Sequence, residues 1–223
     1  MKNATKKLAM SILIALLVIL AGCSSEPITY EEKSYVTSAA EVDTMTIDVK
    51  DRKVEIFQSE DEKIHITYNE SEKEFYKIDL SDRKELSMVY ASHKDWDDYI
   101  GGKAAQENRT IQVWIPDASI ENLVLKTSNE AIELPPLSFA GAVNIEINNG
   151  NIQLDKLNAG TTVTLETKNG DISGSIVGSY DDFAIVSEAK KGESNLPANK
   201  SRGDKALNVS TNNGNINLEF VDS

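Results

Sequence analysis

The only cysteine of this 223-residue sequence, Cys23, is its strongest candidate for covalent chemistry. It directly follows Leu20, Ala21 and Gly22. Upstream lie an almost unbroken apolar run over residues 8–20 and three lysines within the first seven residues. A basic start, an apolar core and a small-residue cleavage point form the three-part pattern of a secretion signal. The apolar run is too short for a comfortable transmembrane helix, which needs about 20 residues, so residues 1–22 are predicted to be a signal peptide.

Leu20, Ala21, Gly22 and Cys23 together resemble the lipobox of bacterial lipoproteins. The resemblance implies that a lipoprotein signal peptidase recognises the first three residues and cuts before Cys23, which carries a diacylglycerol on its sulfur, with palmitate as a typical acyl chain. It therefore implies a lipid-anchored protein on the extracytoplasmic face of the cell membrane, where two acyl chains anchor stably. With its thiol acylated, the mature chain keeps no cysteine for a disulfide, a thiolate metal site or a nucleophile.

The segment after the cysteine is polar. Ser, Thr, Pro, Glu and Lys are frequent over residues 24–41, and large apolar side chains are few. This composition is typical of a solvated linker. Lipidated Cys23 and a flexible tether are therefore predicted over residues 23–41.

The charge balance is strongly acidic. The chain has 23 basic and 36 acidic residues, for a net charge of −13, and loss of the three N-terminal lysines leaves 20 against 36, or −16. Such a surface repels nucleic acid and anionic headgroups, which both attract basic patches. We therefore expect contact with the membrane through the lipid on Cys23 and no nucleic-acid partner.

Residues 42–223 are predicted to form one all-β domain. Ile, Val and Thr are frequent, and apolar residues alternate with polar ones in most apolar stretches. A period of two places successive side chains on opposite faces of a strand, and no stretch has a convincing amphipathic-helix pattern. The clearest strands are predicted at residues 45–49, 64–68, 111–115 and 143–147.

One motif recurs along this domain. At residues 145–154 it reads Ile-Glu-Ile-Asn-Asn-Gly-Asn-Ile-Gln-Leu, and close copies lie at 165–172 and 209–218. Weaker copies lie at 47–56, 125–134 and 185–194. The glycine position falls at residues 130, 150, 170, 192 and 214, so the repeat advances by 20 or 22 residues. That step lies within the range expected of stacked repeats.

The Asn-Gly pairs of the closest copies are predicted to be structural turns, because Gly adopts positive φ freely and Asn tolerates it better than most residues. These residues are Asn149, Gly150, Asn169, Gly170, Asn213 and Gly214. A near-constant step favours a β-solenoid of roughly 20–22-residue coils, in which the three asparagines form a hydrogen-bonded column. Asn-Gly is also the strongest short-range hairpin signal, so the alternative is a hairpin-built β-sandwich or prism.

These repeats resemble the bacterial adhesin-type β-strand-repeat family known as domain of unknown function 4097. The resemblance implies a β-solenoid on the outer side of a bacterial membrane, an adhesion role suggested by name, and no established catalytic residues. Glu130, in a glycine place, and residues 179–202 depart from the repeat. The match rests on residues 145–154 and 209–218, the looser copies at 123–134 and 163–172, and the strand 111–115 ahead of Pro116.

The two histidines offer little catalytic chemistry. His65 alternates with Ile64 and Ile66, which predicts a solvent-facing side chain. His93 lies near Asp95 and two further aspartates, but this cluster lacks the glycine and final glutamate of a calcium loop, and a solvated loop is favoured over a metal site. Nucleophile-elbow, phosphate-loop and zinc-protease motifs are absent from the sequence. No catalytic residue, metal or cofactor is therefore predicted.

The combined prediction is a non-catalytic, lipid-anchored cell-envelope protein that acts as an adhesin or interaction module on the outer side of the membrane. Its expected partner is an envelope protein or a cell-wall polymer. One alternative is an accessory protein for envelope-stress sensing. Another is an enzyme acting on polysaccharide, which would need two carboxylates facing each other across a cleft.

Overall fold

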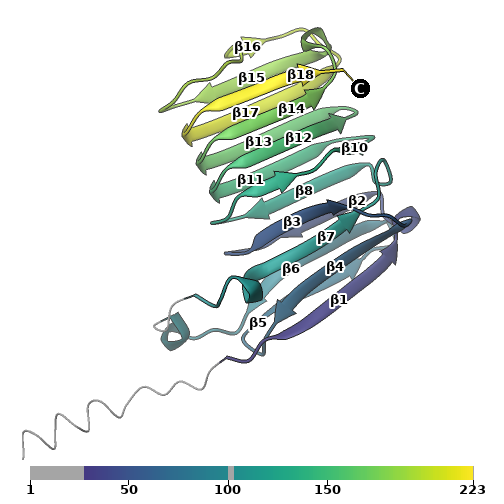
Figure 1. Ribbon diagram of the computed structural model, residues 1–223, viewed down its shortest axis with the longest axis vertical. Helices are drawn as coiled ribbons and strands as arrows, with labels where there is room; N and C mark the ends of the chain where they lie inside the picture. The colour runs from purple at the N-terminus through teal and green to yellow at the C-terminus, as the bar shows by residue number, and fades with distance from the viewer. Residues whose placement is uncertain (1–27, 100–102, 223) are drawn as a thin grey trace, which may run out of the picture.

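The computed structural model describes residues 28–99 and 103–222, which form two β-sheets of nine strands each. Within each sheet the strands lie side by side along the long axis of the molecule, and the two sheets face each other across the core (Figure 1). The only helical elements in this part of the chain are short 3₁₀ turns: η1 (Ala39–Glu41), η2 (Trp96–Tyr99), η3 (Glu107–Arg109) and η4 (Tyr180–Asp182). The described residues contain no helix long and apolar enough to cross a membrane.

The first sheet, sheet A, begins with an edge strand near the N-terminus and ends with the last strand of the chain. Its spatial order is β1 (Glu31–Ser38), β4 (Lys63–Glu70), β7 (Thr110–Ile115), β3 (Lys53–Gln58), β9 (Ile132–Leu134), β12 (Ile152–Ala159), β14 (Ile172–Val177) and β18 (Ile216–Val221), with β10 (Leu137–Phe139) also paired to β12.

The second sheet, sheet B, supplies the opposite wall of the core. Its spatial order is β16 (Asn199–Lys200), β15 (Phe183–Ala189), β17 (Lys205–Asn213), β13 (Thr162–Asn169), β11 (Val143–Asn149), β8 (Asn122–Thr127), β2 (Thr44–Asp48), β6 (Glu85–Ser92) and β5 (Glu74–Leu80).

Each repeat forms one coil with a strand in each sheet. β11 lies in sheet B, the chain turns at Asn149-Gly150, and β12 returns in sheet A. The next coil stacks on it in parallel and in register, with Ile145 opposite Leu165 and Ile152 opposite Ile172. The predicted β-solenoid is therefore confirmed, and the alternative of a hairpin-built sandwich or prism is wrong, because the strands flanking the Asn-Gly turns do not pair with each other.

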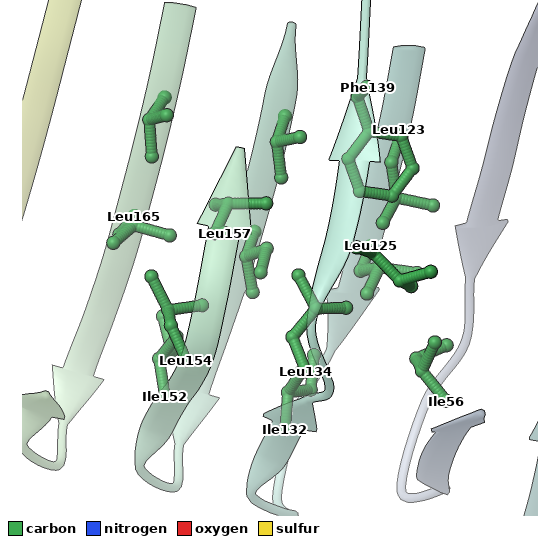
Figure 2. Close-up of a cluster of buried hydrophobic side chains, with 14 of the residues drawn as sticks. Ile56, Leu123, Leu125, Ile132, Leu134, Phe139, Ile152, Leu154, Leu157 and Leu165 are labelled. Carbon is green, nitrogen blue, oxygen red and sulfur yellow. The ribbon is translucent and has the colours of Figure 1, made fainter. Parts of the chain in front are cut away.

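The core lies between the sheets and is built from the inward-facing apolar residues of every coil. Figure 2 shows Leu165 of sheet B next to Leu154 of sheet A, and Leu123 and Leu125 of sheet B next to Leu134 of sheet A. All five side chains are buried. Burying one such side chain stabilises the fold by about 1.5–3 kcal/mol relative to leaving it exposed. The apolar residues that alternate along each strand are therefore the ones that stabilise the core. The strands predicted at 45–49, 64–68, 111–115 and 143–147 coincide with β2, β4, β7 and β11.

The coils do not stack in the order in which they occur in the sequence. β17 pairs in parallel with β13 on one side and with β15 on the other. The repeat at 209–218 therefore lies between the repeats at 165–172 and 185–194. At the other end, β2 lies between β6 and β8. Repeat similarity does not encode this order, since every coil offers the same ladder of backbone groups to its neighbours.

Both ends of the stack are closed by antiparallel strands. At one end β4 runs antiparallel to β7, and β5 runs antiparallel to β6. At the other end the short β16 pairs antiparallel with β15, and Leu196 in the irregular segment before it is buried. Terminal units that differ from the repeats cover the apolar ends of a solenoid.

The predicted tether over residues 23–41 is wrong for its second half. Glu31–Ser38 forms β1, which pairs antiparallel with β4 over all eight residues, and Ala39 is buried after it. β1 is an edge strand with few large apolar residues, so its stability comes from hydrogen bonds to β4, which composition does not reveal. Residues 1–27, including the predicted signal peptide, lie outside the described part of the chain.

We predict that Gly170→Ala destabilises the stack. A Cβ at this position would lie 2.0 Å from the carbonyl oxygen of Gly150 in the adjacent coil. Because this neighbour is backbone, the coils must separate, and the loss of unfolding free energy should reach about 3 kcal/mol. Urea denaturation measures it, with Thr161→Ala, an exposed change on the same coil, as the control. Equal midpoints for the two variants would contradict the close packing of the corners.

Candidate interaction surface

The asparagines at the coil corners form a continuous hydrogen-bonded column. Asn213 Nδ2 donates to Asn169 Oδ1 at 2.5 Å, and Asn169 Nδ2 donates to Asn149 Oδ1 at 2.6 Å. Asn149 Nδ2 in turn donates to Asn129 Oδ1 at 2.7 Å. The column predicted for Asn149, Asn169 and Asn213 is present, and Asn129 of the weaker 125–134 copy extends it. Each amide donates in the same direction along the stack.

The column ends on a carboxylate. Asn129 Nδ2 donates to Asp51, which also accepts from Ser128 Oγ at 3.3 Å and lies 3.4 Å from Lys103 Nζ. Burial raises the pKa of Asp51, but these hydrogen bonds and the lysine outweigh burial and hold its pKa below the usual value. Asp51 has the same place in the 47–56 copy as Asn149 in its own, so aligning the copies identifies it. The corner residues are thus structural.

A groove of about 590 Å³ crosses the outer face of sheet B next to this column. It spans several coils, since its walls come from β2, β8, β11, β13 and β17 and from the residue after β15. We call this outer face, with its groove, the sheet B face. Its side chains are those that alternate with the buried core residues. Most of those that line the groove are charged or polar, whereas Val89 and Val186 are exposed apolar residues elsewhere on the same face.

Two rows of side chains run across the sheet B face, perpendicular to the strands. The first, the acidic row, contains residues that the strand pairing places side by side: Glu188, Ser210, Glu166, Glu146, Lys126 and Asp48. The second, the lysine row, lies two residues further along each strand: Lys190, Asn212, Lys168, Asn148, Ser128 and Lys50.

Most charges of these rows have no ion-pair partner among residues 28–99 and 103–222. Lys126 Nζ lies 3.0 Å from the carboxylate of Glu146. Burial raises the pKa of Glu146, but hydrogen bonds from Lys126 and Asn144 outweigh it and leave the pKa below the usual value. In the described part of the chain, no ion pair involves the lysines at 50, 168 and 190 or the carboxylates at 48, 166 and 188.

A second cluster of charges is buried at the N-terminal end of the stack. The Arg52 guanidinium lies 3.1 Å from Glu74 Oε1, and its Nε donates to Tyr76 at 2.6 Å. Glu74 also accepts from Tyr90 at 2.8 Å and from Tyr30, and lies 2.9 Å from Lys94 Nζ. Arg52 and Glu74 are only 1% and 5% exposed. This cluster joins the segment before β1 to the closing strand β5 and is enclosed, so it has a structural role.

Electrostatics in this cluster favour the charged carboxylate. Burial raises the pKa of Glu74, but hydrogen bonds from Tyr30, Lys94 and Tyr90 and the charge of Arg52 outweigh it, and they lower the pKa to about 2. Burial and the bond to Glu74 raise the pKa of Tyr90 to about 12. Glu74 therefore stays ionised and Tyr90 stays protonated over the physiological pH range.

The remaining predicted positions lie apart from one another. His65 lies on β4 and its Nε2 is 2.9 Å from Asp61, while His93 packs edge-on against Phe75. Within residues 28–99 and 103–222, no three His, Cys, Asp or Glu side chains gather closely enough to hold a metal ion. Leu20, Ala21, Gly22 and Cys23 lie outside the described residues, so the lipid site stays a prediction.

The two rows were missed from the sequence alone, although a signal exists. They occupy the third and first positions before the corner asparagine in each repeat, as Glu166 and Lys168 do before Asn169. Aligning the copies and applying the two-residue alternation would have placed both residues outward. What the alignment lacks is the order of the coils.

Stacked coils with an enclosed core define this chain as a two-sheet β-solenoid with an exposed, charged outer face. The model of the family described as Toastrack DUF4097 matches residues 42–177. This chain therefore belongs to the Toastrack DUF4097 family.

One solved structure shares this fold, and a second gives a weaker match. A candidate cell adhesion protein from Clostridium sporogenes matches with a TM-score of 0.60 and 16% identity, covering 86% of this chain and 100% of its own. A candidate adhesin from Bacteroides fragilis matches with a TM-score of 0.43 and 11% identity, covering 85% of this chain and 97% of its own. No curated protein matches this chain.

We predict that Glu74 makes the fold sensitive to acid. Its folded pKa of about 2 is below the ordinary 4.5, so its stabilisation is complete above about pH 4.5 and is lost as the pH falls towards 2. The shift corresponds to roughly 3 kcal/mol. Urea unfolding at pH 7, 4 and 3 measures it. Glu74→Gln should be less stable at pH 7 and should lose less stability on acidification, and parallel losses for both proteins would contradict the role of Glu74.

Proposed function

We propose that this protein is a non-catalytic interaction module, anchored by a lipid on Cys23 to the extracytoplasmic face of the cell membrane, and that it binds a macromolecular partner through the sheet B face. The observation that carries this proposal is the pair of charged rows, which extend over six neighbouring strands with most of their charges unpaired. A regular face of this length suits an extended partner more than a small molecule, which binds in enclosed apolar pockets. The description of the Clostridium sporogenes structure as a candidate cell adhesion protein supports the same class of function.

The arrangement of carboxylates favours binding over catalysis. Glu146 and Glu166 stand side by side on neighbouring strands, whereas a glycosidase needs two carboxyl groups on opposite sides of the bond that breaks. A general acid also needs a raised pKa, and the pKa of Glu146 is lowered by Lys126. The groove therefore offers recognition by charge and hydrogen bonding.

The short segment between the lipid site and β1 supports a membrane-proximal position. Seven residues lie between Cys23 and Glu31, the first residue of β1, and the eight Cα-to-Cα steps from Cys23 to Glu31 span at most about 29 Å when fully extended. β1 lies at the outer edge of the stack, so the anchor would hold the stack by this end. The sheet B face would then rise away from the membrane.

We predict that Cys23→Ala abolishes lipid attachment and leaves an unprocessed precursor, because the acylated sulfur is removed. The β domain should still fold, since its core lies between residues 39 and 218. Metabolic labelling with a fatty acid, together with gel mobility, measures the change. Normal labelling of Cys23→Ala would refute the anchor.

A photo-reactive amino acid at position 148 tests the binding face. Asn148 is exposed in the groove, and Gln153 of the next strand is exposed on the opposite, outer face of sheet A. Irradiation of intact cells should give adducts from position 148 and few from position 153, as judged by a tag on the protein. Equal adducts from both positions, or none from position 148, would overturn the assignment of the face.

A further inference from the structure

The unpaired charges of the sheet B face occur as matched pairs on single strands. Asp48 precedes Lys50 at β2, Glu166 precedes Lys168 on β13, and Glu188 precedes Lys190 at β15, each by two residues. Both members of each pair lie on the outer face, one in the acidic row and one in the lysine row. The face therefore carries equal and opposite charge along two parallel lines.

We propose that the partner bound by this face is a second copy of the same chain, related by a two-fold axis that runs along the stack between the two rows. This inference rests on the proposed use of the sheet B face for binding. Rotation about such an axis places the acidic row of one copy against the lysine row of the other. Each residue of the acidic row then faces the residue two positions later on the same strand of its partner.

The symmetry pairs every free charge. Asp48, Glu166 and Glu188 of one copy face Lys50, Lys168 and Lys190 of the other, and the reverse contacts follow because a two-fold interface is isologous.

On the strands between these pairs, the residues that face each other across the proposed interface are also compatible. Lys126 faces Ser128, Glu146 faces Asn148, and Ser210 faces Asn212, so an already paired charge or a hydroxyl meets a neutral polar group. On β6, which follows β2 in the sheet, Val89 pairs with Asp48 and extends the acidic row, and it faces Ala91 of the other copy. No like charges meet across the interface.

The charge pattern selects this axis over the other two-fold axis lying in the plane of the face. An axis parallel to the strands would bring the acidic row against the acidic row and the lysine row against the lysine row. Like charges directly opposite each other repel. Only the axis along the stack gives attraction in both rows.

The same axis suits two chains held by one membrane. Rotation about the stack leaves both β1 ends pointing the same way, so both lipid anchors reach one bilayer. Exposed ion pairs are individually weak and are screened by salt, which predicts little association in dilute solution. Anchoring in one membrane raises the effective concentration of the second copy, and that permits a weak, self-complementary face to pair.

A charge swap on β13 tests the proposal. The experiment uses the full-length, lipidated chain with the photo-reactive residue at position 148. Two copies with different tags are produced in the same cell. The wild type should give an adduct that carries both tags. Glu166→Lys and Lys168→Glu each replace attraction by repulsion in two symmetry-related contacts, and each should reduce this adduct roughly five- to tenfold. The double variant E166K/K168E should restore it to within about twofold, because the rows remain complementary when both charges exchange.

Control variants and salt separate this pairing from other outcomes. Gln153→Lys, on the outer face of sheet A, should leave the adduct unchanged, and raised salt in isolated membranes should weaken it. A polyanionic partner would instead bind better to Glu166→Lys and worse to Lys168→Glu. Adducts that contain another molecule and never both tags would overturn the self-association while leaving the binding face intact, whereas absence of any adduct would remove the proposed function itself.

Discussion

The constraint on which this structure depends is that every coil must present the same backbone outline to the coils on either side. Strands of neighbouring repeats stack in parallel and in register, apart from an irregularity between Leu154 and Leu157, so a corner of different size would shift one sheet against the other. Gly170 meets this constraint by allowing the backbone of the next coil to approach where a Cβ would clash. The asparagine column also keeps the corners alike, because the side-chain amide at each corner forms a hydrogen bond with the asparagine at the next corner. The core and the outer rows follow from this repeat, because strands in register align both their inward and their outward side chains.

A stack of this kind is stable along its length and vulnerable at its ends, where an apolar cross-section meets water. The two ends are closed differently. The C-terminal end uses a short antiparallel strand and an irregular segment with one buried leucine, Leu196. The N-terminal end uses antiparallel strands and the buried ion pair of Arg52 with Glu74. Buried ion pairs contribute little net stability compared with apolar packing. We therefore infer that the ion pair of Arg52 with Glu74 fixes the position of β5 relative to the segment before β1.

Much of the fold could be predicted from local pattern because the physics that forms it is local. The alternation at 143–147 specifies a half-buried strand, and the spacing of the glycines at 150 and 170 specifies coils of equal length. Three features could not be predicted for a common reason. The pairing of β1, the order of the last two coils and the alignment of the outer rows all depend on which distant strand becomes the neighbour. The strands are joined by backbone hydrogen bonds, which are the same for every residue type, so the residue pattern does not reveal which strands will pair.

The reversed order of the last two coils has a consequence for how the chain is completed. β15 belongs to the outermost coil of its end, yet β17, which is made later, lies between β15 and β13 in sheet B, and β18 pairs with β14 in sheet A. The stack therefore cannot grow by adding one finished coil after another as the chain emerges. The segment that closes the end must wait until the final strand has been inserted beneath it, so a chain broken off before residue 205 leaves an unfilled layer. Folding of this end of the stack therefore requires the residues of β17 and β18.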